Sequence, residues 1–255
     1  MKALILAAGY ATRLRPLTDT WAKPLLPVGG RPIVDWIVDS VRSVSAVDGI
    51  HLVTNARHAP AFGEWAAANG VEVHDDGTTS NDDRLGAIGD LAFVLERAGV
   101  DDDWLVIAGD NLFEFSLAAF ASFWSKHGVS SAVAARDVRS RELATQYGIV
   151  ALDGDARIVD FVEKPADPPS TLAATATYLF HRAHVALIPE YLAGGNSPDQ
   201  PGRFVGWLYQ REPVYGWVFD EPWYDIGDEH QLLEADNHLR AAHGLPLRTA
   251  YSPSL

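Results

Sequence analysis

The fold of this 255-residue chain is decided largely by one stretch near its start, Leu6-Ala7-Ala8-Gly9-Tyr10-Ala11-Thr12-Arg13-Leu14, followed by Lys23-Pro24. The apolar run 3–6 comes directly before the loop and predicts a buried parallel strand. The small residues and the glycine after this strand allow backbone N–H groups to approach a ligand closely. Two cations, Arg13 and Lys23, follow within the reach of one loop. A strand, a tight loop and two cations together predict a phosphate-binding site.

A glycine turn after a strand is common in α/β proteins, so Ala8-Gly9 alone is a weak signal. The stretch lacks both the Gly-Lys-Ser/Thr of a P-loop and the G-x-G-x-x-G of a dinucleotide-binding turn. The full string resembles the N-terminal signature of the sugar-phosphate nucleotidyltransferases (nucleoside-diphosphate-sugar pyrophosphorylases), G-x-G-T-R-L-x-P-x-T and then K-P-x-x-P-V. Residues 9–18 and 23–28 carry this signature here, with Ala11 in place of the second glycine.

The first half of the sequence alternates between strand and helix patterns. The apolar runs that predict strands are 3–6, 50–53, 71–73 and 104–108. The segments with helical spacing of apolar residues are 32–44, 57–69 and 85–95. Such alternation predicts an α/β fold with a mostly parallel sheet and helices on both of its faces.

The second half of the sequence changes character. It predicts a hairpin around Asp153-Gly154-Asp155, further strands at 175–180 and 214–219, and a helix near 232–239. We therefore expect a Rossmann-like three-layer α/β/α architecture with a mixed, mostly parallel central sheet, as the resemblance also implies for a nucleotide-diphospho-sugar transferase.

The chain has no Ser/Gly-rich linker and no internal repeat, so we expect one nucleotidyltransferase domain over residues 1–255. We expect a nucleotide-binding lobe at about 1–135, a sugar-phosphate-binding lobe at about 136–240 and a C-terminal tail at 241–255. The resemblance implies a short form of the family, without the C-terminal β-helix that many relatives carry.

Composition excludes several classes of function. The formal net charge of −14 argues against a nucleic-acid or anionic-membrane surface, and means that local cations must attract any phosphate ligand. The absence of cysteine excludes thiol catalysis, disulfides and thiolate metal sites, and makes the cytoplasm the expected location. We interpret residues 1–9 as a core strand rather than a signal peptide, and no apolar run is long enough to span a membrane.

Two carboxylates are candidate metal ligands. Asp110 follows the predicted strand 104–108, and Asp225 lies in the segment Trp223-Tyr224-Asp225-Ile226-Gly227. Carboxylates at the carboxyl ends of strands suit Mg²⁺ that is shared with substrate phosphates, although each could instead cap a turn or a helix. The resemblance implies that Asp110 and Asp225 together hold the catalytic Mg²⁺.

The resemblance also implies a sugar-phosphate site. The motif Glu163-Lys164-Pro165 is similar to the family's E-K-P, in which the glutamate contacts sugar hydroxyls and the lysine contacts the sugar phosphate. Gly148 stands where the family's Y-G motif approaches the sugar, and Tyr178 lies in a strand of the sugar pocket. A Glu-Lys pair taken alone would more commonly be a solvated surface feature.

For the nucleotide, the resemblance implies contacts from the first loop and from a second, glycine-containing segment at 85–89. The residues concerned are Leu6, Ala8, Gly9, Tyr10, Ala11, Thr12 and Gly86. The glycines at 86 and 89 are also compatible with an ordinary helix start. Whether Arg84 reaches a phosphate or Asp82 is left open by the sequence.

The reaction that the resemblance implies is attack of a sugar 1-phosphate on the α-phosphorus of a nucleoside triphosphate, with release of pyrophosphate. Arg13 and Lys23 would be its catalytic cations and Mg²⁺ its cofactor. Two alternatives remain: a nucleotide-sugar-dependent glycosyltransferase, which would not need the Arg13/Lys23 loop, and a non-catalytic regulatory homologue, which would be expected to lose such residues. The sequence leaves open whether copies of the chain form a homo-oligomer.

The nine histidines show no spacing typical of a metal site. His181 and His184 are three residues apart, but no third ligand stands at a motif spacing from them. We therefore expect core or surface roles for the histidines.

Overall fold

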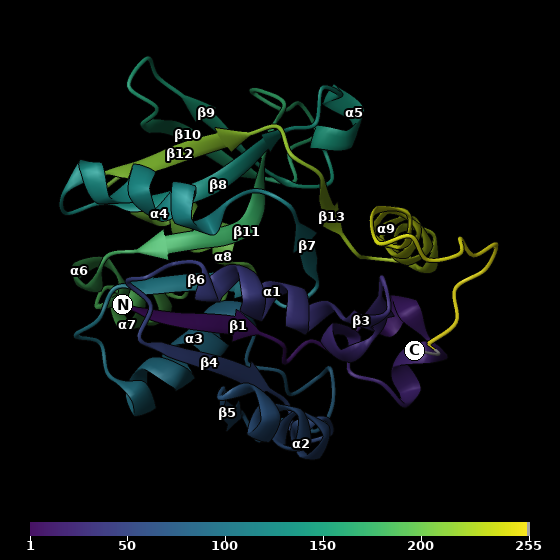
Figure 1. The fold of residues 1–255 in the computed structure, drawn as a ribbon. Coiled ribbons are helices and arrows are strands. Elements are labelled where there is room, and N and C mark those ends of the chain that lie inside the picture. The colour runs from purple at the N-terminus through teal and green to yellow at the C-terminus, as the bar shows by residue number, and fades with distance from the viewer. Residues whose placement is uncertain (254–255) are drawn as a thin grey trace.

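Strand β1 (Lys2–Leu6) lies in the middle of a nine-stranded sheet in the computed structural model, which describes residues 1–253 (Figure 1). It is flanked by the parallel strands β4 (Gly49–Thr54) and β6 (Trp104–Ala108), and β4 pairs in parallel with the edge strand β5 (Glu72–Asp75). Leu6 is in register with Ala108, so β1 and β6 end at the same edge of the sheet. The loops that follow these two strands therefore begin side by side.

The second half of the sheet is mainly antiparallel. Strand β11 (Leu172–Phe180) pairs antiparallel with β6 and links it to β8 (Ser131–Asp137) and β9 (Gly148–Leu152). The remaining strands are β10 (Ile158–Glu163), antiparallel to β9, and β12 (Val214–Phe219), parallel to β8. The predicted α/β fold with a mixed central sheet is confirmed.

Alternate side chains of a strand point to opposite faces of the sheet. Both faces of this sheet are apolar, and helices cover each of them. On one face Ala3 and Ile5 belong to the same buried cluster as residues of α1 (Ile33–Arg42). On the other face Leu4 shares a cluster with residues of α3 (Ala87–Ala98). The other α-helices are α2 (Ala59–Asn69), α4 (Leu117–Trp124), α5 (Arg141–Ala144), α6 (Arg182–Val185), α7 (Ile188–Ala193), α8 (Pro201–Leu208) and α9 (Glu229–Ala242).

Two short ribbons lie outside the main sheet. Strands β2 (Pro27–Val28) and β3 (Arg31–Pro32) form one of them. The other joins β7 (Asn111–Phe113) to β13 (Trp223–Asp225), with Asp225 in register with Asn111. Segments more than 100 residues apart in sequence thus meet directly beyond the end of β6.

The helix predicted at 85–95 begins only at Ala87. Gly86 precedes it with φ 80°, a conformation that favours glycine, and a Cβ there would lie 2.7 Å from the carbonyl oxygen of Pro198. The backbone of 198–199 accepts hydrogen bonds from the N–H groups of Ala87 and Ile88. A segment distant in sequence therefore caps this helix and fixes its start.

Tyr251 fastens the C-terminal tail to the body of the protein, although most of the described tail residues are exposed. Helix α9 extends to Ala242, and the hydroxyl of the buried Tyr251 donates a hydrogen bond to the carbonyl oxygen of Pro27 at 2.9 Å. Residues 254–255 of the expected tail lie outside the described residues. Among residues 1–253, no helix has the length and apolar character needed to cross a membrane.

Helix α3 buries one carboxyl group, that of Asp90, which is 6% exposed. Burial, and then the charge of Asp76, raise the pKa of Asp90 to about 8. Its Oδ1 atom accepts no hydrogen bond from any residue that the structure describes. Ionisation of Asp90 in the folded protein therefore costs free energy at neutral pH.

We predict that Asp90→Asn stabilises the protein increasingly as pH rises. Unfolded Asp90 loses its proton near pH 4 and folded Asp90 near pH 8, so the folded state holds an extra proton in between. The contribution of Asp90 to the free energy of unfolding is therefore complete below about pH 4, and it is lost as pH rises to about 8. Urea unfolding of both proteins between about pH 5 and about pH 8 should show a widening gap in free energy of unfolding. Glu96→Gln, at an exposed position of the same helix, is the control and should open no such gap. A gap for Asp90→Asn that is constant with pH would contradict the assignment.

Candidate active site

The loop after β1 is tied to its surroundings through its backbone. The N–H of Ala7 donates to the carbonyl of Val53 at 2.9 Å, and the Asn55 amide donates to the carbonyl of Ala8 at 2.9 Å. The hydroxyl of Thr18 donates to the carbonyl of Ala11 at 2.9 Å. Gly9 stands between these tethers, and a Cβ there would meet no heavy atom within 4 Å. The loop is thus fixed while its glycine faces open space.

Ala11, which replaces the second glycine of the signature, adopts a left-handed conformation with φ 43° and ψ 44°. An L-residue with a Cβ pays roughly 1–2 kcal/mol for this conformation, whereas glycine adopts it freely. The loop therefore has a backbone path suited to glycine although alanine occupies the position. The first cation, Arg13, lies one residue into the short 3₁₀ helix Thr12–Leu14 that follows.

A cavity of about 380 Å³ opens above this loop. Every predicted nucleotide-binding residue except Tyr10 lines it, as do both predicted catalytic cations, Arg13 and Lys23. Asp110 reaches the same cavity from the end of β6. Residues from distant parts of the sequence therefore line one space.

Tyr10 has a different position from its neighbours. Its side chain is 6% exposed, and its hydroxyl is 3.1 Å from the hydroxyl oxygen of Thr78, with which it shares a hydrogen bond. The Thr78 backbone and hydroxyl donate in turn to Asp76. Tyr10 thus anchors the first loop to the segment after β5, and its ring lies outside the cavity lining.

Arg84 also lines the cavity, and it pairs with a residue that the sequence did not suggest. Its guanidinium group pairs with Asp199 at 3.3 Å and donates to the carbonyl of Asn81. Asp199 belongs to the same 198–199 segment that caps α3. The pair closes one side of the cavity with a chain segment from the second half of the protein.

The second cation, Lys23, forms an ion pair with Asp110. The distance from its Nζ to Oδ2 is 2.8 Å, and the lysine side chain is only 10% exposed. Burial acts to raise the pKa of Asp110, but the charge and hydrogen bond of Lys23 outweigh it and hold the pKa below its ordinary value. The Asn111 amide donates to the other oxygen of Asp110 at 3.1 Å. Asp110 is therefore ionised at neutral pH.

Asp225 is brought to the same place by the β7–β13 ribbon. Next to it, the N–H of Ile226 donates to the Asp110 carbonyl at 3.2 Å, and the Trp223 indole donates to the Asn111 side chain at 2.5 Å. Burial and then the negative charge of Asp110 raise the pKa of Asp225 to about 6. Two carboxylates thus repel one another in a partly buried space. A multivalent cation would reduce this repulsion.

A second cavity, of about 160 Å³, contains the predicted sugar-phosphate residues. All four of them line it: Gly148, Glu163, Lys164 and Tyr178. Asp225 lines it as well, and both Ala176 and Pro201 line the two cavities at once. The two spaces are therefore adjacent, with Asp110 bordering the first and Asp225 the second.

The position of the Glu163 carboxylate depends on two glycines. A Cβ on Gly148 would lie 2.9 Å from Glu163 Oε2 and 2.8 Å from the Phe161 ring. A Cβ on Gly202, in α8, would lie 2.9 Å from the same oxygen and 2.6 Å from the same ring. The absence of side chains at both positions makes room for Glu163 and Phe161. Gly148 thus has a packing role besides the backbone approach predicted for it.

Backbone conformation is unusual at three positions in these cavities. Besides Ala11, both Lys164 (φ 48°) and Ala176 (φ 51°) have positive φ, and the described chain contains only two other such residues that are not glycine. Strained backbone of this kind concentrates at functional sites.

Sequence reasoning missed several residues of the two cavities. Asp90, Asp199 and Pro201 line the first, and Gln200 and Gly202 line the second. No motif marks these residues, because α8 and the segment before it reach the site through tertiary packing. The one available signal was the polar Asp90 among the apolar positions of the predicted helix.

Comparisons with known proteins identify the family of the chain. A family model described as nucleotidyl transferase matches residues 2–242. The bifunctional protein GlmU of Methanocaldococcus jannaschii is 29% identical over 239 residues, which cover 94% of this chain and 54% of that protein. A UTP–glucose-1-phosphate uridylyltransferase of Synechocystis is 30% identical, over 89% of this chain and 60% of that protein. The chain thus spans little more than half the length of these curated relatives.

Solved structures share the fold. A putative glucose-1-phosphate thymidylyltransferase from Bacillus anthracis superposes with a TM-score of 0.78 at 23% identity, covering 94% of this chain and 95% of that one. A UDP-glucose pyrophosphorylase in complex with UDP-glucose gives a TM-score of 0.79 at 21% identity, with 94% and 98% coverage. Because the family model spans nearly the whole chain, these findings together show that the chain belongs to the nucleotidyl transferase family.

Proposed function

We propose that this protein transfers a nucleotidyl group from a nucleoside triphosphate to a sugar 1-phosphate or a similar phosphorylated alcohol, with release of pyrophosphate. The observation that supports this most is the pair of adjacent cavities. One is lined by the loop with Arg13 and Lys23, and the other by Glu163 and Lys164. The names of the relatives, which include uridylyl- and guanyltransferases of sugar 1-phosphates, favour the same reaction.

The cations divide the work of charge neutralisation. Arg13 holds the departing pyrophosphate, Lys23 the α-phosphate, and Lys164 the attacking phosphate. The nucleophile is a phosphate oxygen whose second pKa is near 6, so it is already ionised at neutral pH and needs no protein base. Catalysis then consists of positioning the reactants and stabilising the negative charge of the transition state.

The donor set at the junction of the cavities fits Mg²⁺. Asp110 and Asp225 offer carboxylate oxygens, the ligands that this ion prefers, and their mutual repulsion favours an added positive charge. Asp110 and Asp225 would hold the ion, which would supply further charge neutralisation at the reacting phosphate groups. The ion pair with Lys23 keeps Asp110 ionised and available as a ligand.

We further infer that the two lobes expected from the sequence, at about 1–135 and 136–240, supply the nucleotide and sugar-phosphate subsites respectively. The division has exceptions, since Ala176, Asp199 and Pro201 of the second lobe border the first cavity. The nucleotide subsite is thus completed by the sugar-phosphate lobe.

The experiment that tests the function crosses each common nucleoside triphosphate with a panel of sugar 1-phosphates in the presence of Mg²⁺. At least one pair should give equimolar pyrophosphate and nucleoside-diphosphate sugar, measured by coupled phosphate release and by mass spectrometry. If every pair fails while nucleotide sugars are consumed with an acceptor, the protein is a glycosyltransferase. If nothing reacts, the catalytic proposal is wrong.

Loss of Lys23 should slow the reaction severely. We predict that Lys23→Ala lowers kcat by about 10²–10³-fold, comparable to the loss of one oxyanion donor, because the α-phosphate loses a buried cation. Lys126→Ala, at an exposed lysine of a short 3₁₀ helix that lines neither cavity, is the matched control and should retain parental kcat. Near-normal turnover by Lys23→Ala would remove this lysine from the mechanism.

Gly202→Ala should impair the sugar-phosphate subsite selectively. The new Cβ would displace Phe161 and Glu163, so we predict that KM for the sugar 1-phosphate rises by roughly tenfold while KM for the nucleoside triphosphate changes little. Gly63→Ala, in helix α2 where a Cβ meets nothing within 4 Å, should leave both constants unchanged. Equal effects of Gly202→Ala on both KM values would argue against separate subsites.

A further inference from the structure

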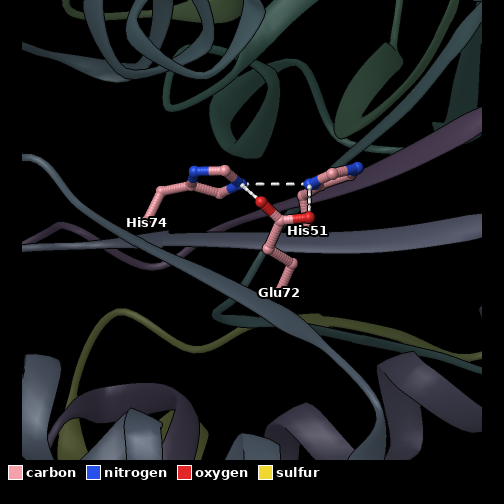
Figure 2. Close-up of side chains that lie close together, drawn as sticks. All are labelled: His51, Glu72 and His74. Atoms are coloured by element: carbon pink, nitrogen blue, oxygen red, sulfur yellow. Dashed lines mark hydrogen bonds and ion pairs between the residues drawn. The ribbon is translucent and has the colours of Figure 1, made fainter. Parts of the chain in front are cut away.

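Three potential metal-ligating side chains meet in the parallel sheet, outside the two cavities of the candidate active site. They are His51 of β4 and Glu72 and His74 of β5 (Figure 2). His51 is in register with Glu72, and His74 lies two residues further along β5, so all three occupy one face of the sheet. The ligands are 21 and 23 residues apart in sequence, which is why spacing did not reveal them. His181, by contrast, caps α6, and the buried His184 shares a hydrogen bond with the Ser131 hydroxyl.

The distances among the facing atoms suit a tetrahedral ion. His51 Nδ1 is 3.0 Å from His74 Nε2, 3.5 Å from one oxygen of Glu72, and His74 Nε2 is 3.7 Å from the other oxygen. Bonds of about 2.0–2.1 Å to Zn²⁺ in tetrahedral geometry place neighbouring ligands about 3.3 Å apart. Figure 2 shows both rings turned toward the Glu72 carboxylate. Small movements would place all three around one ion.

The histidines are in the protonation state that a metal requires. Both are more than nine-tenths buried, and burial lowers the pKa of each, so both imidazoles are neutral at pH 7. In the 3.0 Å contact one ring donates its proton to the other. If that proton moved to the other nitrogen of its own ring, both facing nitrogens would have a lone pair free for the metal. No proton would have to leave the protein.

A neighbouring cavity is open to two of the three side chains. A cavity of about 420 Å³, near the amino ends of β1 and β4, is lined by His51 and Glu72 and also by Lys2, Asp48 and Arg97. The two cations are already engaged, since Lys2 pairs with Asp48 at 3.1 Å and Arg97 stacks on the Phe93 ring. Glu72 and Asp48 balance their charge. With solvent from this cavity as the fourth ligand, the three side chains would form an open zinc site.

We propose that His51, Glu72 and His74 bind a divalent ion of the zinc class, separate from the Mg²⁺ site of the proposed reaction. Imidazole and carboxylate ligands favour Zn²⁺ or Co²⁺ over Mg²⁺, which prefers oxygen ligands and octahedral geometry. Strand β5 is at the edge of the sheet and β4 is its neighbour, so the ion cross-links the edge strand. Binding therefore stabilises the folded state.

The test is titration of the metal-free protein with Co²⁺ and Zn²⁺ in the presence of excess Mg²⁺. Co²⁺ should develop the strong visible absorption of a tetrahedral site, Zn²⁺ should displace it, and Zn²⁺ should raise the unfolding temperature. His74→Gln should abolish the absorption, and Glu72→Gln should weaken binding by about tenfold or more. Glu64→Gln, at an exposed glutamate of α2, is the matched control and should bind as the parent does.

Asp225→Asn separates this site from the catalytic one, since it should impair the proposed reaction and leave the Co²⁺ spectrum intact. If His74→Gln does not fold, the metal affinity of Glu72→Gln provides the test. The Glu72 side chain is 66% exposed, so this substitution should not disturb the fold. An octahedral Co²⁺ spectrum, or equal affinity of Glu72→Gln and the parent, would overturn the proposal and leave a hydrogen-bonded histidine pair.

Discussion

The ion pair between Lys23 and Asp110 is the interaction on which the candidate site depends. It joins the loop after β1 to the end of β6 across a 2.8 Å contact, and it keeps a partly buried carboxylate ionised. In a chain with a formal net charge of −14, such local cations must overcome the repulsion of the whole protein toward phosphates. Lys23 therefore organises the site. In the proposed reaction it also attracts the phosphate groups that the net negative charge of the chain repels.

The parallel core holds that pair in place, and the second half of the chain completes the site. The β7–β13 ribbon sets Asp225 beside Asp110, while α8 contributes Gly202, which makes room for Glu163. Left-handed conformations at Ala11, Lys164 and Ala176 store strain that packing elsewhere must offset. Such strain is consistent with a backbone shaped for ligand contact rather than for maximal stability.

The sequence predicted the α/β class and most parallel-half elements, because β1, β4 and β6 are apolar runs and α1 and α3 have clear helical periodicity. The family resemblance also grouped Arg13, Lys23 and Asp110, and the structure brings them to one cavity at the carboxyl ends of neighbouring parallel strands. The sequence did not predict α4, α7 and α8, nor the contacts of Asp90 and Gly202. Those depend on packing between segments distant in sequence, as does the meeting of His51 with Glu72 and His74, which no spacing rule describes.

In the proposed reaction the site acts by positioning and charge neutralisation, with the sugar phosphate itself as nucleophile. The stereochemistry at the α-phosphorus tests this most directly, with a nucleoside triphosphate that carries sulfur in place of one α-oxygen. A single in-line displacement predicts inversion of configuration in the nucleoside-diphosphate sugar. Retention would mean two displacements through a nucleotidyl-protein intermediate, and would contradict the account.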